Sequence, residues 1–179
     1  MSDFADKSKT FALIMAGGKG TRFWPESTER KPKQYLNLLG EKSLLKQTID
    51  RLDGFALSKN TFVVTVKDQE DLIKKNMDGK VPVQNIIFEP SGRNTAPCIL
   101  LSLAELLEKG ASPEDVVVIM PSDHVILDES GFRATLEKGT HQAIKHNAIT
   151  VIGIQPNFPH TGYGYIEKGE KKVEENCNL

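Results

Sequence analysis

The stretch LIMAGGKGTRFWP, residues 13–25, begins as an apolar run and then breaks into three glycines, two cations and an aromatic pair ahead of a proline. An apolar run that stops at glycines is typical of a buried strand leading into a loop. Gly17, Gly18 and Gly20 allow the backbone to approach a ligand closely, and exposed N–H groups in such a loop can donate to phosphate oxygens. The stretch therefore predicts a first strand followed by a loop suited to a nucleotide.

Two well-known nucleotide-binding motifs do not match this loop. A Walker A loop needs Gly-Lys-Ser/Thr after four residues from its first glycine, and the dinucleotide fingerprint needs a glycine where this sequence has Phe23. The sequence therefore excludes a P-loop ATPase and a classical Rossmann dehydrogenase. A second interpretation stays open at this point, namely a solvated basic loop around a structural glycine turn.

Cationic side chains are concentrated around the glycines and just after them. Arginine grips a phosphate with two parallel hydrogen bonds and lysine supplies a point charge, so the cluster predicts a clamp for a polyphosphate. The five cations are Lys19, Arg22, Arg30, Lys31 and Lys33.

Five short apolar runs predict strands, and most of them show no alternation of polar and apolar residues. Continuous β-branched runs of this length fit strands that are buried on both faces, as in a parallel sheet covered by helices. The predicted strands lie at 11–15, 61–66, 85–89, 115–120 and 150–154.

Helical patterns separate these runs. Ser43 can cap a helix over 43–52, and Asp68 can cap one over 68–77. Apolar residues recur at helical spacing from Thr95 to Lys109, and a weaker helix is expected at about 131–146. Alternating strands and helices predict an α/β fold of the Rossmann-like type, with a doubly wound, mostly parallel sheet and helices on both faces.

The length, net charge, N-terminus and cysteines of the chain narrow the possible functions further. Its 179 residues fit one domain, and a net charge of −1 gives no general attraction to nucleic acid or to an anionic membrane. The polar N-terminus is followed by too short an apolar run for a signal or membrane segment, so we expect a cytoplasmic protein. Cys98 and Cys177 show neither disulfide nor zinc spacing, and we expect a buried Cys98. Assembly into a homo-oligomer stays open.

Polar residues follow the third and fourth predicted strands, where α/β proteins bind ligands. Arg93, Asn94 and Thr95 stand at the beginning of a helix, where free N–H groups can meet a base or a phosphate, although Asn94 or Thr95 could be only an N-cap. Asp123 follows the next strand and is the predicted Mg²⁺ ligand, with an Asx turn or a helix cap as its alternative role.

The segment after the fifth run carries glycines between aromatic residues. Gly162 and Gly164 could let the backbone approach a sugar while Tyr163 or Tyr165 packs beside it. A tight turn that leads into an edge strand explains the same residues equally well.

Taken together, four segments resemble the nucleotidyltransferases that activate sugar 1-phosphates, and most closely the bacterial mannose-1-phosphate guanylyltransferases. FWP followed by PKQ, combined with EPxxRNTAP, is much more specific than the bare GGxGTR of the wider superfamily. The resemblance covers about 160 residues and rests on AGGKGTRFWPESTERKPKQ at 16–34, FEPSGRNTAPC at 88–98, PSDH at 121–124 and GIQPNFPHTGYGYIEKG at 153–169.

The resemblance implies a reaction of GTP with α-mannose 1-phosphate that gives GDP-mannose and pyrophosphate, with Mg²⁺ as the cofactor. It assigns catalysis to Arg22, Lys33 and Asp123, of which Asp123 would hold the metal, and it places the sugar against Gly164. The nucleotide would be bound by Ala16, Gly17, Gly18, Gly20, Thr21, Arg22, Arg93, Asn94 and Thr95.

Members of this group continue with a Glu-Lys-Pro motif and a second metal-binding aspartate, and some carry a C-terminal isomerase domain. None of these features occurs in residues 1–179. The resemblance thus implies a truncated fold, the N-terminal nucleotide-binding part of a catalytic domain. Two other functions stay open: a nucleotide-binding fragment or regulatory homologue without catalysis, and a transferase for another nucleotide and sugar.

Overall fold

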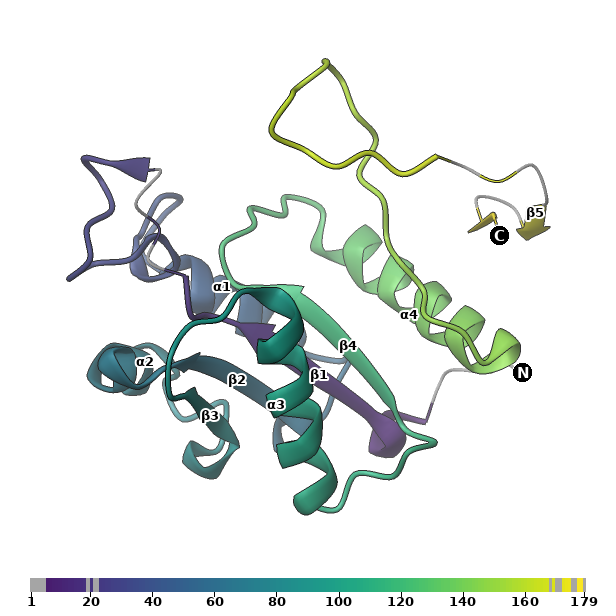
Figure 1. Cartoon of the computed structure of the whole chain (residues 1–179), viewed down its shortest axis with the longest axis horizontal. Helices are drawn as coiled ribbons and strands as arrows, with labels where there is room; N and C mark the ends of the chain where they lie inside the picture. Colours follow the sequence, from purple (N-terminus) through teal and green to yellow (C-terminus); the bar gives the residue numbers. More distant parts are fainter. Residues whose placement is uncertain are drawn as a thin grey trace.

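The fold is built around a four-stranded, all-parallel sheet with the strand order β3-β2-β1-β4. It was obtained as a computed structural model that describes residues 6–18, 20, 23–167, 169, 172–174 and 177–178. Figure 1 shows the sheet crossing the centre of the molecule. The strands are β1 (Thr10–Met15), β2 (Thr61–Val66), β3 (Ile86–Glu89) and β4 (Val116–Pro121).

The parallel register brings the carboxyl ends of the strands to one edge. Ala12 of β1 lies opposite Thr61 of β2 on one side and Val118 of β4 on the other. Val63 of β2 lies opposite Ile86 of β3. The loops that follow β1, β3 and β4 therefore emerge together, as expected for a parallel sheet.

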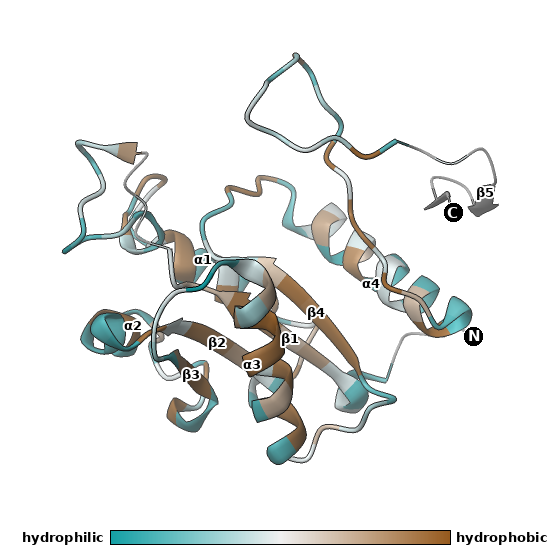
Figure 2. Ribbon diagram, in the orientation of Figure 1, coloured by the Kyte–Doolittle hydropathy of each residue, from teal (hydrophilic) through white to brown (hydrophobic). Residues whose placement is uncertain are grey.

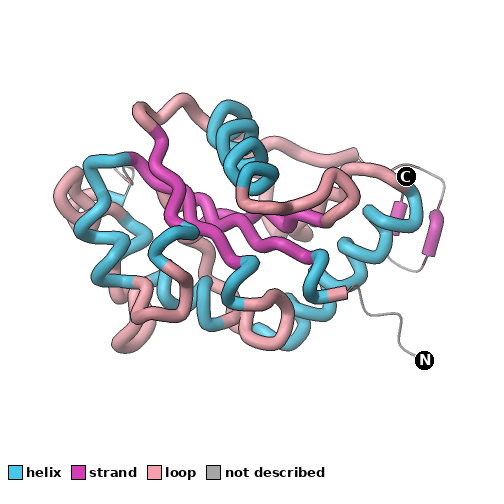
Figure 3. The backbone as a smooth tube through the Cα atoms, turned by 90° about the horizontal axis from the view of Figure 1, so that it is seen from below, coloured by secondary structure: helices cyan, strands magenta, loops and turns pink. Residues whose placement is uncertain are grey.

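Helices cover both faces of the sheet (Figure 3), which confirms the predicted doubly wound α/β architecture. One face is covered by three helices, and their apolar residues form one core with the inward side chains of β1 and β2. The other face is covered by α3, which packs through Cys98 and Leu106. The helices are α1 (Leu44–Asp50), α2 (Glu70–Asn76), α3 (Thr95–Glu108) and α4 (Glu129–His146).

Burial on both faces explains why the strands read as continuous apolar runs. Leu13, Ile14, Val63 and Val64 are fully buried although consecutive side chains point to opposite faces. Figure 2 shows the central strands as the most hydrophobic part of the fold. Cys98 is buried in the α3 core, as predicted.

Of the two predicted helix caps, one agrees with the structure and one differs. Ser43 caps α1 by accepting a hydrogen bond from the Lys46 N–H. Asp128, which was not predicted as a cap, caps α4 by accepting one from the Gly131 N–H. The prediction that Asp68 caps the second helix is wrong, because a 3₁₀ turn over Lys67–Gln69 precedes α2 and places Gln69 at its N-cap.

The predicted strand at 150–154 is also wrong. These residues are extended but exposed, with Ile154 80% accessible, and they pair with no strand. Thr150 and Ile152 instead lie beside Gly139 of α4 (Figure 1), so the sheet edge is out of reach. A short antiparallel pair, β5 (Lys172–Glu174) and β6 (Cys177–Asn178), follows later in the chain.

None of the described helices is both long enough and apolar enough to cross a membrane.

Candidate nucleotide site

The candidate site lies where the strand order reverses. The chain places β2 and β3 on one side of β1 and then crosses over through α3 to place β4 on the other. In open α/β sheets, ligands bind beyond the carboxyl ends of the strands at such a reversal. The glycine loop after β1 lies at this position, with Glu89 at the end of β3 on one side and Asp123 beyond β4 on the other.

The glycines of this loop are required by close contacts. A Cβ on Gly20 would lie 2.6 Å from the backbone nitrogen of Lys33, and Gly20 adopts a positive φ of 64°. A Cβ on Gly17 would lie 3.0 Å from Oε2 of Glu89. Gly18 faces open space, with nothing within 4 Å of the corresponding position. The loop is thus tightly packed at two glycines and open at the third.

A buried amide network supports the loop from beneath. The Gln34 side chain donates to the carbonyls of Ala16 at 2.7 Å and Gly18 at 2.9 Å, and it lies 3.1 Å from Oε1 of Gln69. Gln69 Oε1 also accepts a hydrogen bond from the Tyr35 hydroxyl at 3.0 Å. The carbonyls of the loop are therefore satisfied from inside the protein.

Among the described residues of the loop, the N–H groups of Gly17 and Gly18 have no such partners. No described residue accepts a hydrogen bond from the N–H of Gly17 or Gly18. Backbone donors left open beside the carboxyl edge of a sheet can bind phosphate or ribose oxygens. The predicted loop residues Lys19, Thr21 and Arg22 lie outside the described residues.

Glu89 is a candidate site residue that the sequence reasoning missed. It ends β3, is only 6% exposed, and holds its carboxylate against Gly17. Its other neighbour is the Cys98 thiol, whose pKa is raised to about 11 by burial and, to a lesser degree, by the charge and hydrogen bond of Glu89. The sequence could have indicated Glu89, because it directly follows an apolar run. A carboxylate is rarely buried unless it has a binding partner or a function.

The start of α3 presents the residues predicted there. Asn94 occupies the N-cap with φ 67°, and its side chain makes no capping hydrogen bond. A non-glycine residue at positive φ is uncommon, and an asparagine that does not cap leaves its amide available for a ligand. Arg93, Asn94 and Thr95 are all exposed. Asn94 therefore occupies the N-cap position that the alternative interpretation gave it, but its side chain does not cap the helix, and the helix start stays open to a ligand.

Asp123 lies just beyond β4, where its carboxylate meets Lys33. Lys33 Nζ is 3.3 Å from Asp123 Oδ2 and 3.2 Å from the Asp123 carbonyl, and it also lies 5.7 Å from the centre of the Phe23 ring. Both charged side chains are partly exposed, at 29% for Lys33 and 39% for Asp123. The structure thus brings together two of the three residues predicted to act in catalysis.

The surroundings of Asp123 suit one kind of metal. The described residues contain no group of three or more acidic, histidine or cysteine side chains that could enclose an ion. Mg²⁺ commonly takes one or two carboxylates and completes its shell with water and substrate phosphates. A single accessible carboxylate beside an open glycine loop fits this requirement.

Other predicted groups lie apart from the site. Arg30 and Lys31 are exposed in a turn closed by the bridge between Thr28 and Lys31. Gly164 belongs to a loop that stands away from the sheet (Figure 1), where the Tyr165 hydroxyl accepts a hydrogen bond from the His160 N–H. The structure therefore does not bring Gly164 to the glycine loop.

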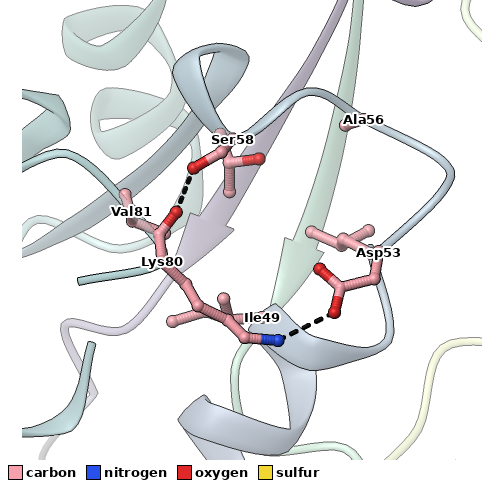
Figure 4. Close-up of a pocket in the computed structure, with 8 residues that line it drawn as sticks. Ile49, Asp53, Ala56, Ser58, Lys80 and Val81 are labelled. Carbon is pink, nitrogen blue, oxygen red and sulfur yellow. Dashed lines mark hydrogen bonds and ion pairs between the residues drawn. The ribbon is translucent and has the colours of Figure 1, made fainter. Parts of the chain in front are cut away.

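A small cavity lies away from the candidate site, beside the C-terminal end of α1. Its volume is about 30 Å³, room for one or two water molecules rather than a nucleotide. Lys80 closes it by donating to Asp53 at 2.7 Å, and Ser58 donates to the Lys80 carbonyl (Figure 4). None of the predicted site residues lines this cavity.

Comparison with known proteins agrees with this arrangement. The chain is 39% identical over 171 residues to a mannose-1-phosphate guanylyltransferase of Escherichia coli (strain K12), in a match that covers 94% of this chain and 35% of the relative. It is 38% identical over 162 residues to the xanthan biosynthesis protein XanB of Xanthomonas campestris pv. campestris (strain B100), in a match that covers 90% of this chain and 34% of that relative.

A solved structure shows the same fold. The crystal structure described as a mannose-1-phosphate geranyltransferase from Thermus thermophilus superimposes with a TM-score of 0.78 at 33% identity, covering 92% of this chain and 47% of that chain. The chain spans about a third of the length of the curated relatives it matches. The family model for nucleotidyl transferases matches residues 11–175, and the chain therefore belongs to the nucleotidyl transferase family.

Proposed function

We propose that the protein transfers GMP from GTP to α-D-mannose 1-phosphate, giving GDP-mannose and pyrophosphate in the cytoplasm. Residues 1–179 would form the nucleotide-binding part of its catalytic domain. The observation that carries the proposal is the Lys33–Asp123 pair beside the glycine loop, since it would supply a cation and a metal ligand next to bound phosphates. The names of the relatives supply the choice of guanosine and mannose.

Glu89 gives this choice a physical basis on the nucleotide side. Guanine presents two adjacent donors, N1–H and the 2-amino group, and a carboxylate accepts both at once. Uracil places carbonyl oxygens on both sides of its N–H, and these would repel a carboxylate. The buried Glu89 beside Gly17 therefore favours a guanine whose edge lies against the end of β3.

The reaction joins two anions, and the chain's cations would lower their repulsion. The sugar phosphate oxygen attacks the α-phosphorus in line with the departing pyrophosphate, which needs positioning and charge stabilisation rather than a protein nucleophile. Lys33 would turn from Asp123 to the phosphates, and Arg22 would contact the same charges. The open N–H groups at Gly17 and Gly18 would bind the nucleoside, and Gly20 and Thr21 the triphosphate.

Asp123 would hold Mg²⁺ once Lys33 has turned away. When bound, this ion supplies a Lewis acid that offsets the charge building on the leaving group. Arg93, Asn94 and Thr95 would complete the nucleotide pocket from the start of α3, and Ala16 would contact the nucleotide through its backbone. Gly164 would contact the sugar after the loop that carries it has moved toward the site.

Calorimetric titration with GTP and Mg²⁺, and then with UTP, tests the nucleotide part of this proposal. A parallel assay of pyrophosphate release with mannose 1-phosphate tests the transfer. We expect GTP to bind at least about tenfold more tightly than UTP, since one well-placed pair of hydrogen bonds discriminates by about 1–3 kcal/mol. GTP binding without release would favour a nucleotide-binding fragment, and equal affinities would contradict guanine selection.

A further inference from the structure

Arg51 is a buried arginine that the proposed mechanism does not use. It is the C-cap of α1, is 2% exposed, and is the largest fully buried side chain of the described residues. No described carboxylate forms an ion pair with it, and its Nε has no hydrogen-bond partner. Removing a guanidinium from water costs free energy, so the contacts of the buried Arg51 side chain indicate its role.

The guanidinium lies 5.9 Å from the centre of the Phe132 ring of α4, and its hydrogen bonds are directed at Thr48 and at the segment that carries Asp123. Both terminal nitrogens of Arg51 lie 3.2 Å from the carbonyl oxygen of His124. One of them also donates to the Thr48 hydroxyl at 3.3 Å. That hydroxyl donates its proton to the Leu44 carbonyl at 2.9 Å, and its oxygen packs 3.4 Å from the carbonyl oxygen of Ser122. The last turn of α1 thus contacts the backbone on both sides of Asp123.

The remaining backbone groups of this segment are held as well. The Ser122 N–H donates to the Met15 carbonyl at the end of β1, at 3.0 Å. The Asp123 carbonyl accepts a hydrogen bond from Lys33. Three consecutive carbonyls, those of residues 122–124, therefore each contact a different side chain, which leaves the Asp123 carboxylate as the group that faces outward.

If Lys33 turns to the phosphates, the contacts from Arg51 and Thr48 are the ones that remain to hold residues 122–124. Lys33 holds Asp123 through both its carboxylate and its carbonyl, and both contacts end if Lys33 turns to phosphate as proposed above. Arg51 and Thr48 are buried and cannot leave in this way. They would then be the side chains that keep the segment in place while the carboxylate binds a metal.

We infer that Arg51 and Thr48 are positioning residues that fix the backbone around Asp123, so that its carboxylate is preset for a divalent cation carried by the nucleotide. The inference rests on the proposed function for the metal and concerns residues that touch neither the nucleotide nor the ion. Partners one step removed from a metal typically change its affinity about 10–100-fold when they are lost.

The test is the Mn²⁺ affinity of the full chain in the presence of GTP, measured from the free-ion signal by electron paramagnetic resonance. Arg51→Met keeps the apolar stem and removes the donors, and burying a neutral side chain there should permit folding. We expect Mn²⁺ affinity to fall about tenfold, GTP affinity in EDTA to stay within about twofold, and amide exchange at residues 123–125 to accelerate.

Arg133→Met is the matched control. Arg133 donates to the Arg51 carbonyl at 3.1 Å and pairs with Glu129, and its described hydrogen bonds and ion pairs do not include residues 122–124. It should leave both the Mn²⁺ affinity and the amide exchange of that segment unchanged. Arg51→Lys, which restores one donor, should recover part of the affinity, and Thr48→Val supplies a milder variant if Arg51→Met does not fold.

A folded Arg51→Met protein with wild-type Mn²⁺ affinity would overturn the inference, as would an equal loss of GTP binding in EDTA. Asp123→Asn separates this failure from failure of the proposed function. If Asp123→Asn weakens Mn²⁺ binding and Arg51→Met does not, the positioning role alone is wrong. If Asp123→Asn also binds Mn²⁺ like the wild type, the metal assignment is wrong, and the positioning role falls with it.

Discussion

Lys33 and Asp123 are 90 residues apart in the chain, and their side chains form an ion pair of 3.3 Å across the mouth of the candidate site. Both are partly exposed, so the pair contributes no more than about 1 kcal/mol to stability. A phosphate can therefore displace Lys33 at little cost. The pair keeps a cation and the proposed metal ligand together in the absence of nucleotide.

Asp123→Asn tests the carboxylate of this pair. We expect the Mg²⁺-dependent gain in GTP affinity to fall at least about tenfold, since the amide is a weaker ligand for a hard cation. The free energy of unfolding should change by less than about 1 kcal/mol, because the ion pair is partly exposed. Calorimetry with and without Mg²⁺, beside urea denaturation, measures both. A large loss of stability with intact Mg²⁺ dependence would contradict this role.

Glu89→Gln tests guanine selection. The amide keeps the shape of the carboxylate but turns one acceptor into a donor, which faces a donor of guanine. We expect GTP affinity to fall about 10–100-fold while UTP affinity stays the same or rises. Cys98→Ala controls for the thiol that contacts Glu89 and should leave the ratio of the two affinities unchanged. Equal losses for both nucleotides would indicate that Glu89 only supports the loop.

Gly20→Ala should destabilise the fold by about 1–3 kcal/mol. The added Cβ would lie 2.6 Å from the Lys33 nitrogen at a positive φ, and backbone on both sides would have to move. Gly18→Ala is the matched control in the same loop, and its Cβ would meet nothing within 4 Å. Urea denaturation of the two variants should show a clear difference, and similar midpoints would contradict the close packing at Gly20.

The buried Cys98 predicts a loss of stability in alkali. Burial raises the pKa of its thiol from 9.0 to about 11, so the unfolded chain releases this proton at a lower pH than the folded one. Between these values the free energy of unfolding falls as the pH rises, and below about pH 9 the thiol has no effect. Tyr35 acts in the same direction, since burial raises its pKa from 10.0 to about 12.

Urea denaturation at several pH values between about 8 and 11 would check this, with Cys98→Ala as the comparison. The variant should lose less stability over that interval because it has no proton to release there. Parallel curves for the two proteins would show that the Cys98 thiol does not titrate differently in the folded and unfolded states.

Limited proteolysis should cut the segment after α4 first. Residues 149–166 are exposed and contribute to no sheet, whereas Phe62 in β2 is buried. Chymotrypsin should therefore cleave after Tyr163 or Tyr165 well before Phe62, as mass spectrometry of the fragments would show. Protection of both sites would indicate that this segment forms a strand in solution.

Local patterns in the sequence were sufficient for the first four strands and most of the helices. β2 occupies the predicted residues 61–66, and α3 ends one residue before the predicted end at Lys109. A strand buried on both faces has a continuous run of apolar residues, and an amphipathic helix has apolar residues at helical spacing. Both patterns can therefore be recognised from neighbouring residues alone. The position of the glycine loop was predicted in the same way, from glycines that directly follow a strand.

The fifth run shows where this reasoning fails. TVIGI at 150–154 has the composition of a strand, but a strand also needs a partner, and this segment lies along α4 instead. Asp68 is a similar case, because the preceding 3₁₀ turn moved the start of α2 to Gln69. For residues 150–154 the tertiary contact with α4 decided between structures that the local sequence permits equally.

The sequence by itself determined the class of fold, the position of the glycine loop and the chemical types of the site residues, because each depends on residues adjacent in the chain. Only the tertiary structure decided that Lys33 meets Asp123, that Glu89 lies against Gly17, and that Arg51 is buried beneath residues 122–124. The physical reason is the strand order β3-β2-β1-β4, which determines which loops emerge side by side and follows from the packing of the whole sheet rather than from any one segment.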